Sequence, residues 1–572
     1  MKTLRRIGAG TALAVAVVAL GATGALGKTP PRRPARDPGV IVQGPQAARI
    51  DSFMTAAAAL GAEGTLLVER DGKVILSRGY GLADRGRKIP ATTTTPYILG
   101  SLSKQFTAAA AYKLESRGKL GLSDSLGRWF PDAPPDKRGI TVDELIHHTS
   151  GLPYLNRGDM YDSISVDSMV RETFSYPLEF APGTKYAYSS PGYDLLALIV
   201  ERASGERFED YVRRELFDPA GMTETGFVDE PARWPPAKRT PAYSSSDPEA
   251  DPPLYPVARA PKIVGSGSVI STTGDLWKWE QALRSGRVLD AAATRELFTP
   301  GPASGTNSFY AGGWQVVRSM RNTSVVMHAG DLGGFNADMR RLVDEHATII
   351  FLSNAREGGR GYREIIPIMV TRILFGPEPE LPRPMARVAS AELAGWKGAV
   401  TLAPGVPVEA RVRAGSVWLT ARTQEGMFVL TGADSSARAQ APSLNRLAAA
   451  VADSLLHGGA HGLDSTFSPS LVETGRPEFY RFWRLEADSV GGPTRVEVLG
   501  TVVSSPYAAR TLVRLEGTRG KRLMTLDWVS GKLIQSVSVG SDGLTLRFEA
   551  ESRDRLSRYD LWGGRFVRVA RG

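Results

Sequence analysis

Residues 98–118 read ILGSLSKQFTAAAAYKLESRG: a glycine and polar residues lead into a helix-prone run rich in Ala, Gln, Lys and Leu. Gly100 permits a tight entry, which places Ser101 at the helix N-terminus with Lys104 three residues later. Positions i and i+3 share one face of a helix, so the lysine amine can reach the serine hydroxyl. This spacing predicts a serine nucleophile with a base beside it, because a hydroxyl attacks poorly until its proton is removed.

A lysine can act as that base if burial or a nearby positive charge lowers the pKa of its amine. The helix N-terminus adds unpaired N–H groups suited to an oxyanion at the attacked carbonyl. Ser-x-x-Lys alone is weak evidence, since roughly one or two matches arise by chance in a chain of this length. A second match, Ser116 to Lys119, contains Gly118 and is interpreted as the end of the same helix.

The composition, 42% hydrophobic and 23% charged over 572 residues, is that of a globular protein too long for one core. The absence of cysteine excludes disulfides, a thiol nucleophile and thiolate metal sites. Formal net charge is +10, and the basic residues are scattered rather than clustered. This predicts a solvated basic surface, with weak attraction to an anionic cell envelope and no nucleic-acid site. The sequence makes no prediction about oligomeric state.

Residues 1–27 have the form of a secretory signal peptide, with Lys2, Arg5 and Arg6 before an apolar stretch that ends in small residues. We therefore expect export to the periplasm or the medium. The alternative is an uncleaved N-terminal anchor, because the apolar run is nearly long enough to span a bilayer. Residues 28–46 are proline-rich and are expected to form a disordered linker.

Hydrophobic periodicity predicts a mixed α/β (α+β) region over residues 47–375. Two alternating runs joined at Asp71-Gly72 predict a hairpin over 64–84. A short helix ended by Ser150-Gly151 is expected within 140–153, a loop leading into an amphipathic helix over 180–205, and helices over 208–222 and 362–374. Residues 265–286 are expected to form a strand, a turn and a helix, and segments typical of successive antiparallel strands fill 310–354. The loop 235–262 is rich in proline and serine, so we expect a functional rim or a disordered excursion there.

A proline-rich linker, 376–389, leads to residues 390–572, where the pattern changes. Short β segments over 396–430 precede an amphipathic helix at 443–459 and further alternating runs. We therefore expect a β-rich C-terminal accessory domain. It contains no serine–lysine, histidine–aspartate or carboxylate pair that repeats a catalytic pattern.

Six motifs occur in the order seen in the serine β-lactamase-like superfamily: RDGKVILSRGYGLAD, LGSLSKQFTA, HHTSGLP, PGTKYAYSSPGYDLLALIVE, STTGDL and HAGDLGGF. Together they are specific, although no single motif is. The set resembles the class C β-lactamase branch, with its penicillin-binding esterases, D-aminopeptidases and DD-peptidases. The resemblance covers roughly residues 47–375 and implies a β-lactamase/transpeptidase-like fold, in which an antiparallel sheet is joined to a helical subdomain.

The resemblance implies that Ser101 is the nucleophile and Lys104 its hydrogen-bonded partner. Tyr188 opens Tyr-Ser-Ser, which matches the family's Tyr-x-Asn, and would be the second base and the leaving-group acid. A cation beside a tyrosine favours its phenolate form, so the tyrosine can accept and donate protons during the reaction. His328 opens His-Ala-Gly in the place of the family's Lys-Thr-Gly. From the residues alone, ordinary packing of Tyr188 and an ordinary polar role for His328 remain open.

By the same resemblance, the backbone N–H groups of Ser101 and Asp331 would form the oxyanion hole, with Gly330 just before Asp331. Ser190 stands where the family has an asparagine, whose amide contacts both the lysine and the acyl-amide group of peptide-like substrates. A serine hydroxyl is shorter and offers fewer donors and acceptors. This departure weakens the case for a true β-lactamase and leaves esterase or peptidase activity open.

The adjacent His147 and His148 are interpreted as structural, with hydrogen bonds to the turn 149–151, because neighbouring side chains point differently and no carboxylate pattern accompanies them. Trp314 is expected to pack beneath the site. We expect no metal and no cofactor.

In the C-terminal region, the order of a helix and then strands over 443–540 resembles an NTF2-like domain. The segments 391–430 and 541–570 resemble the small lipocalin-like β-domain often appended to these hydrolases. Either resemblance implies an accessory unit for binding or assembly.

We therefore expect an exported serine hydrolase that forms an acyl-enzyme on Ser101 and hydrolyses a small ester, a β-lactam or a cell-wall D-peptide. Its partner would be a small-molecule or peptidoglycan-derived substrate, selected by loops such as 154–175 and 235–262. The alternative is a penicillin- or peptidoglycan-binding or sensing protein with slow or no turnover.

Overall fold

The computed structural model describes residues 37–154, 164–243, 260–305, 307–319, 321–357, 360–376, 379, 391–413, 416–456, 466, 483–484, 486–505, 508–529, 533–539, 543–552, 554–560 and 565–572. The predicted signal peptide lies outside these residues, as do residues 28–36 of the first predicted linker and most of the second. Residues 155–163 and 244–259 of the loops 154–175 and 235–262 also lie outside them. The chain divides into the units Met1–Pro38 and Gly39–Gly572, and all elements below belong to the second. No helix in the described part is both long and apolar enough to cross a bilayer.

A nine-stranded sheet forms the centre of the N-terminal region, in the order β1-β3-β2-β14-β13-β12-β11-β10-β9. Its strands are β1 (Ile41–Val42), β2 (Gly64–Arg70), β3 (Lys73–Tyr80), β9 (Ala303–Gly305), β10 (Ser308–Tyr310), β11 (Gln315–Arg318), β12 (Ser324–Leu332), β13 (Phe335–Leu342) and β14 (Ala347–Ser353). Every neighbouring pair is antiparallel. Side chains alternate between the faces, so Leu66 and Val68 lie in one apolar core and Leu67 in another.

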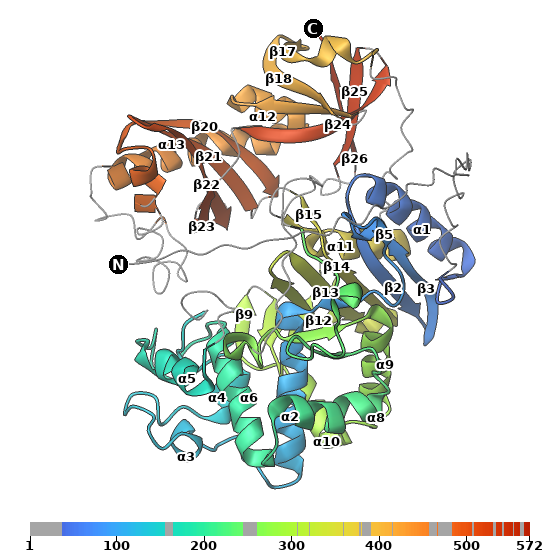
Figure 1. Cartoon of the computed structure of the whole chain (residues 1–572), viewed down its shortest axis with the longest axis vertical. Helices are drawn as coiled ribbons and strands as arrows, with labels where there is room; N and C mark the ends of the chain where they lie inside the picture. The colour runs from blue at the N-terminus through green and yellow to red at the C-terminus, as the bar shows by residue number, and fades with distance from the viewer. Residues whose placement is uncertain are drawn as a thin grey trace, which may run out of the picture. The chain divides into compact units, whose positions relative to one another are not determined.

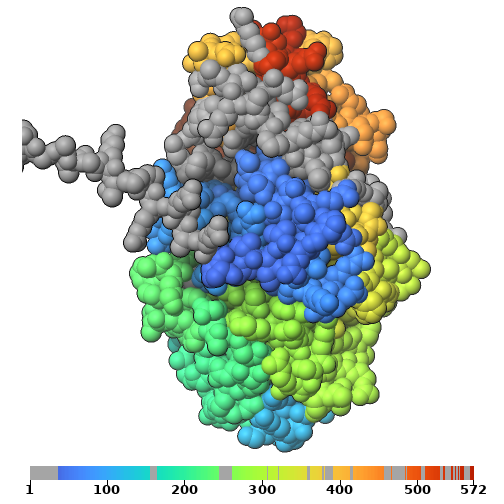
Figure 2. All heavy atoms as spheres, turned by 90° about the vertical axis from the view of Figure 1, so that its right-hand side faces the viewer, coloured from blue at the N-terminus to red at the C-terminus, as the bar shows by residue number. Residues whose placement is uncertain are grey.

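Different helices cover the two faces of this sheet (Figure 1). On one face lie α1 (Gly44–Ala59) and α11 (Ile366–Phe375), where Gln46 Nε2 donates to the carbonyl of Leu374 at 3.1 Å. Figure 2 shows these distant segments side by side, in blue and in yellow. The other face is covered by α2 (Lys104–Ser116), α6 (Ser190–Ser204), α9 (Thr273–Arg284) and α10 (Ala291–Phe298).

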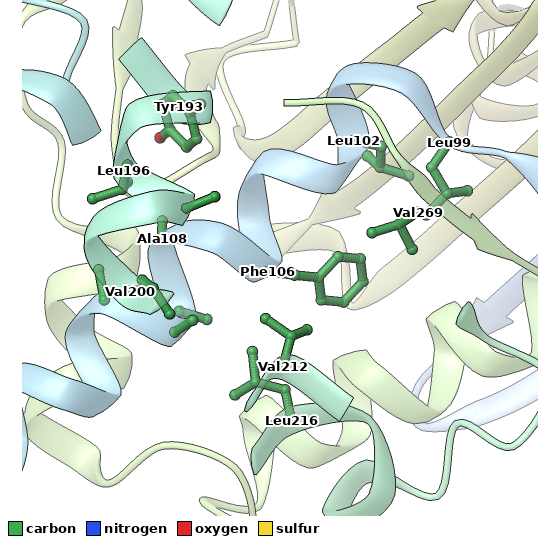
Figure 3. Close-up of a cluster of buried hydrophobic side chains, with 14 of the residues drawn as sticks. Leu99, Leu102, Phe106, Ala108, Tyr193, Leu196, Val200, Val212, Leu216 and Val269 are labelled. Carbon is green, nitrogen blue, oxygen red and sulfur yellow. The ribbon is translucent and has the colours of Figure 1, made fainter. Parts of the chain in front are cut away.

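Helix α2 runs through the larger core. Residues 108–111 are four consecutive alanines, all fully buried, so this helix is enclosed on all sides instead of being amphipathic. Phe106 contacts Phe217 and Trp279 at ring-centroid distances of 5.2 and 4.9 Å. Figure 3 shows the Phe106 ring directed toward Val212 and other apolar side chains of this core. The core therefore fixes the helix that follows Ser101.

Smaller elements connect the sheet and the main helices. They are β4 (Leu82–Asp84), β5 (Ile89–Pro90), β6 (Tyr97–Ile98), η1 (Gly100–Ser103), α3 (Leu126–Trp129), α4 (Val142–Ile146), α5 (Val166–Ser175), α7 (Phe208–Val212), η2 (Arg213–Phe217), α8 (Asp218–Ala220), β7 (Gly226–Phe227), η3 (Pro236–Lys238), η4 (Pro261–Ile263), β8 (Val269–Ser271), η5 (Val343–Glu345), β15 (Arg356–Glu357), β16 (Arg360–Gly361) and η6 (Tyr362–Glu364). Strands β6, β8 and β7 form a small sheet in that order, which anchors the entry to η1.

The predicted hairpin is confirmed: β2 and β3 are joined at Asp71 and Gly72, whose φ angles of 51° and 82° are those of a two-residue hairpin turn. The antiparallel strands predicted within 310–354 are also confirmed. The predicted α/β fold with an antiparallel sheet and a helical part is therefore the fold that this region has.

Three local predictions differ from the structure. The short helix expected within 140–153 ends at Ile146, with His147 as its C-cap, because His148 adopts a left-handed φ of +57°. The helix expected over 208–222 divides into α7, η2 and α8. The linker predicted over 28–46 is too long, since Val42 pairs with Leu76 of β3 and α1 begins at Gly44.

The C-terminal region contains two antiparallel sheets. A six-stranded sheet has the order β17 (Gly398–Leu402), β18 (Val406–Arg413), β19 (Ser416–Ala421), β24 (Leu544–Ser552), β25 (Arg555–Asp560) and β26 (Arg565–Ala570). A four-stranded sheet has the order β20 (Pro493–Ser505), β21 (Ala508–Gly517), β22 (Gly520–Val529) and β23 (Leu533–Val539), with apolar residues of α13 (Ser435–Leu456) in its core. The sequence analysis assigned the segments 391–430 and 541–570 to one β unit, and strands from both segments do form the six-stranded sheet. One difference is α12 (Gln424–Thr431), a helix where strands were expected, after η7 (Ala394–Trp396) and β17–β19.

Strand β12 lies directly against η1, and Gly330 makes this approach possible. A Cβ atom on Gly330 would lie 1.8 Å from the carbonyl oxygen of Leu99 and 3.0 Å from the nitrogen of Leu102. Backbone atoms cannot move aside as a flexible side chain can, so only glycine fits. This contact sets the distance between the Ser-x-x-Lys turn and the strand that carries His328.

We predict that Gly330→Ala lowers the free energy of unfolding by about 1–3 kcal/mol, the usual cost of overpacking a core. The matched control is Gly274→Ala in α9, where a Cβ would meet only the Thr272 hydroxyl at 3.8 Å. Urea unfolding of both variants measures the difference. Equal stability of the two variants would contradict the role given to Gly330.

Candidate active site

Ser101 lies in the 3-10 turn η1, immediately before α2, and not in the first turn of the α-helix itself. Gly100 precedes it with a φ of +54°, and a Cβ there would lie 2.7 Å from the nitrogen of Asp331. The turn therefore requires glycine both for its backbone conformation and for its contact with β12. In a 3-10 turn residues i and i+3 are eclipsed, which brings Lys104 over Ser101.

The Lys104 amine is fully buried and contacts three oxygen atoms. Its Nζ lies 3.2 Å from Ser101 Oγ, 3.3 Å from Ser190 Oγ and 3.1 Å from the carbonyl oxygen of Ser266. Burial lowers the pKa of Lys104 well below its ordinary value, and the charge of Asp194 partly opposes the shift. This is the burial effect that the sequence analysis named as one way to make a lysine a base.

Tyr188 lies in the loop before α6, with its ring centroid 4.7 Å from Lys104 Nζ. Its hydroxyl is buried and has no hydrogen-bond partner of ordinary geometry among the described residues. Burial raises the pKa of Tyr188 well above its usual value, and the nearby Ser101 hydroxyl opposes this only in part. The expectation that a neighbouring cation favours the phenolate is therefore wrong, because burial shifts the pKa in the opposite direction and favours the protonated phenol.

His328 on β12 is held in one neutral tautomer by its two hydrogen bonds. Its Nδ1 lies 2.6 Å from the carbonyl of Ala329, which can only accept, so Nδ1 carries the proton. Its Nε2 lies 3.1 Å from the Tyr310 hydroxyl, which therefore donates to it. Burial, followed by the charge of Lys104, lowers the pKa of His328 to about 3. The first residue of the family's Lys-Thr-Gly motif is a cationic lysine, whereas β12 carries the uncharged ring of His328 at that position.

Asp331 follows Gly330 on β12, and its backbone faces Gly100, so the two predicted oxyanion donors belong to adjoining segments. The carboxylate of Asp331 forms an ion pair with Arg356 and lies 3.6 Å from Arg363 Nε. The residues predicted for the site from three separate motifs, at 101–104, 188–190 and 328–331, thus come together around one buried amine.

Ser190 is the first residue of α6 and is almost fully buried. The preceding Ser189 caps the helix, because its Oγ accepts the N–H of Gly192 at 3.1 Å. Ser190 keeps the contact with the lysine that was attributed to the family's asparagine, although it has no amide to offer to a substrate.

His148 has a different partner from the predicted one. Its Nδ1 accepts the backbone N–H of Ser189 at 3.0 Å, and its ring lies 4.2 Å from that of Tyr188. His147 instead contacts Asp143 Oδ1 at 2.9 Å. Neither side chain reaches the turn 149–151 among the contacts of the described residues. His148 therefore orients the segment that carries Tyr188 and Ser190.

Two further residues were not identified from the sequence. Tyr310 holds the ring of His328, and Asp194 lies near the lysine from inside α6. A carboxylate among the apolar residues of that helix is a signal that could have indicated Asp194, because Leu195 and Leu196 beside it are fully buried. Trp314 is buried in the core, as predicted. Within the described ranges, no group of three His, Cys, Asp or Glu side chains could hold a metal ion.

The chain is similar to several known proteins. A family model described as Beta-lactamase matches residues 47–368. Penicillin-binding protein 4* of Bacillus subtilis (strain 168) is 32% identical over 341 residues, which cover 56% of this chain and 74% of that protein. Esterase EstB of Burkholderia gladioli is 34% identical over 188 residues, which cover 29% of this chain and 48% of the esterase, so the match spans about half of that relative.

A solved structure, the octameric penicillin-binding protein homologue from Pyrococcus abyssi, is similar over most of the chain. The two share 17% sequence identity with a TM-score of 0.51, and the likeness covers 91% of this chain and 99% of that one. It concerns the fold alone, and it extends past the end of the family match into the C-terminal region.

We predict that His328→Gln makes the protein less sensitive to acid. The pKa of His328 is about 3 in the fold against an ordinary value of 6.5, so between these pH values the unfolded chain binds a proton that the folded chain does not. Stability is therefore lost as pH falls through this window, and removing the imidazole should save about 3 kcal/mol between pH 7 and pH 4.

Urea unfolding at the two pH values measures this saving. The exposed His346, changed to Asn, serves as the control and should leave the pH dependence unchanged. The same acid sensitivity in His328→Gln as in the unaltered protein would contradict a buried neutral imidazole.

Proposed function

Because the chain belongs to the β-lactamase family of serine hydrolases, we propose that it forms an acyl-enzyme on Ser101 and releases the acyl group to water. The observation that carries this proposal is the 3.2 Å contact between Ser101 Oγ and the fully buried amine of Lys104. A buried amine with a lowered pKa has a lone pair available near neutral pH, and a hydroxyl beside it can become a nucleophile.

In the acylation step, Ser101 Oγ bonds to the substrate carbonyl carbon while its proton passes to Lys104 Nζ. The backbone N–H groups of Ser101 and Asp331 are the proposed donors to the developing oxyanion. The closeness of Gly100 to the backbone of Asp331 supports this assignment, since it brings the two segments together. Removing one preorganised donor of this kind typically lowers kcat by about 10²–10³-fold.

Tyr188 is the proposed acid for the leaving group. As a phenol it holds a proton, and it can donate that proton as the bond to the leaving group breaks. The proton that Lys104 took from Ser101 then restores the phenol, so the net transfer is from Ser101 to the leaving group. In deacylation, water attacks the acyl carbon and gives a proton to Lys104 or Tyr188. The bond between Ser101 Oγ and the acyl carbon then breaks, and Ser101 Oγ takes up a proton from the same two residues.

His328 and Ser190 are the proposed substrate-contacting residues of the site, with Gly330 providing the close approach of β12. A neutral His328 can hold its place by hydrogen bonding without competing for the proton that Lys104 receives. Ser190 supports a preference for simple esters over β-lactams, because it presents no amide to clamp an acyl-amide side chain.

We also propose that the hydrolase domain is residues 47–375, that residues 390–572 form an accessory domain, and that the protein is exported. The family match over residues 47–368 supports the first boundary, and the signal-like residues 1–27 support export. A panel of nitrocefin, p-nitrophenyl esters and D-alanyl peptides would identify the substrate class. A persistent adduct without turnover on all of them would instead favour a penicillin-binding or sensing protein.

Ser101→Ala should abolish hydrolysis and covalent labelling by a fluorophosphonate, and the fold should survive because the residue is small and half-buried. The matched control is Ser116→Ala in the second Ser-x-x-Lys, which is exposed and only hydrogen-bonds to the carbonyl of Lys113. Activity and labelling are measured on purified proteins with equal circular dichroism. Full activity in the first variant, or its loss only in the second, would move the nucleophile elsewhere.

Ser190→Asn should raise the ratio of β-lactam to ester kcat/KM about two- to tenfold, since one well-placed hydrogen bond is worth about 0.5–1.5 kcal/mol. An asparagine oxygen can still accept from Lys104, while its NH₂ group becomes available to an acyl-amide. Nitrocefin and p-nitrophenyl butyrate are the two substrates.

Ser190→Ala is the companion variant, because it removes the hydroxyl without adding an amide, and its ratio should not rise. If the Asn variant leaves the ratio unchanged or lowers it, Ser190 does not determine the choice between these substrates.

A further inference from the structure

Asp194 is a fully buried carboxylate on α6, one helical turn after Ser190. Its Oδ1 accepts two backbone N–H groups, from Gly265 at 3.1 Å and from Ser266 at 3.0 Å. A carboxylate in an apolar interior is costly unless hydrogen bonds or an opposite charge replace its hydration. The steps described so far for the reaction at Ser101 do not use this group.

The same short segment is also held by α2. Lys104 Nζ donates to the carbonyl of Ser266 at 3.1 Å, and Thr107 Oγ1 donates to the carbonyl of Gly265 at 2.7 Å. Lys104 and Asp194 therefore hold one peptide segment through the carbonyl and the N–H of the same residue, Ser266. This places the two charges close together, across a backbone that both helices fix.

The segment packs against α6 too closely for any side chain at residue 265. A Cβ on Gly265 would lie 2.2 Å from the carbonyl oxygen of Tyr193 and 2.7 Å from the Cβ of Ala197. Helices α2 and α6 contact each other directly, and both contribute apolar side chains to the core that Figure 3 shows. The segment between the amine and the carboxylate is thus held by hydrogen bonds from both helices and by close packing on α6.

We propose that Asp194 is a positioning residue that stabilises the ammonium form of Lys104, the form created when Ser101 gives up its proton. The inference rests on the proposed function, since it assigns Lys104 as the acceptor of that proton. In the step itself, the O–H bond of Ser101 breaks as its oxygen bonds to the acyl carbon, and the proton goes to the lone pair of Lys104. The product is a buried ion pair that Asp194 completes.

The causes of the pKa shifts of the two groups fit this geometry. Burial lowers the pKa of Lys104 and the charge of Asp194 opposes it, while burial raises the pKa of Asp194 and the charge of Lys104 opposes that.

Burial favours the uncharged form of the four other titratable side chains around the amine. The rings of Tyr188 and Tyr193 lie 4.7 and 5.6 Å from Lys104 Nζ, and burial raises the pKa of both. The pKa of both His148 and His328 is lowered, first by burial and then by the charge of Lys104. The charge that supports the ammonium at this position therefore comes from Asp194.

Asp194→Asn tests the inference through the pH profile. The variant keeps an oxygen for the two N–H donors and removes only the charge. Without that charge the ammonium of Lys104 loses its proton at lower pH, so the acid limb of kcat/KM for p-nitrophenyl butyrate should move down by about 1–3 pH units.

The control is Asp275→Asn, at a buried carboxylate that accepts the N–H of Glu224 at 2.7 Å and is bonded to none of the site residues named above. Its acid limb should not move. An unmoved acid limb in Asp194→Asn would overturn the inference, since a purely structural aspartate would change the rate without changing the limb.

A second measurement needs no activity and covers the case in which Asp194→Asn folds poorly. Lys104→Met removes the cation, which raises the pKa of Asp194 further. A carboxyl with a raised pKa in the fold supports stability below its unfolded pKa and loses that support as pH rises. The Tm of Lys104→Met should therefore fall by about 5 °C or more at pH 8, and by less at pH 5.

Adding Asp194→Asn to Lys104→Met should restore most of this loss and remove its pH dependence, because the remaining buried charge is then gone. Independent, additive effects of the two substitutions on Tm would overturn the inference. Coupling in this cycle together with no hydrolysis by the unaltered protein would instead overturn the proposed function and leave the charge pair standing.

Discussion

Burying a lysine amine removes its hydration, which costs several kcal/mol unless other polar atoms take the place of water. In this protein three oxygens do so for Lys104, one each from Ser101, Ser190 and Ser266. These oxygens come from a 3-10 turn, a helix N-terminus and a connecting segment, so the amine joins three parts of the chain. The surrounding core must hold all three in place for the amine to remain buried with a lowered pKa.

Close backbone contacts are how the fold meets this requirement. Gly100 and Gly330 let η1 and β12 approach until a Cβ on either would overlap backbone atoms, and Gly265 does the same between its segment and α6. Burial is also the largest cause of the pKa shifts of His328 and Tyr188, and both shifts favour the uncharged side chain. Burial therefore explains both the lowered pKa of the lysine and the direction of the pKa shifts of its neighbours.

Local patterns explain why much of this was predictable from the sequence. The Ser101–Lys104 spacing, the Asp71-Gly72 turn and the alternating strands each depend on residues a few positions apart, and each is present. What could not be predicted depends on burial, which sums contacts from distant segments. The protonated state of Tyr188, the partner of His148 and the place of Asp194 beside Lys104 all belong to that class. The helix α12 is different, because local signals for it are present in the sequence. Thr423 caps its start, and Gly432 ends it with a φ of +60°.

A lysine can become a base either by burial or by a neighbouring cation, and the structure distinguishes the two. The position that is a lysine in the related motif is His328, whose pKa of about 3 leaves it uncharged. The charge that acts on Lys104 is instead negative, from Asp194, and it favours the ammonium. Burial must therefore lower the pKa of Lys104 against an opposing carboxylate. In the proposed reaction, burial keeps Lys104 a weak base that can release the proton again to Tyr188 and the leaving group, which a strongly basic amine would retain. The neutral ring of His328 and the buried carboxylate of Asp194 thus act on the amine together, since the first adds no positive charge and the second favours the ammonium.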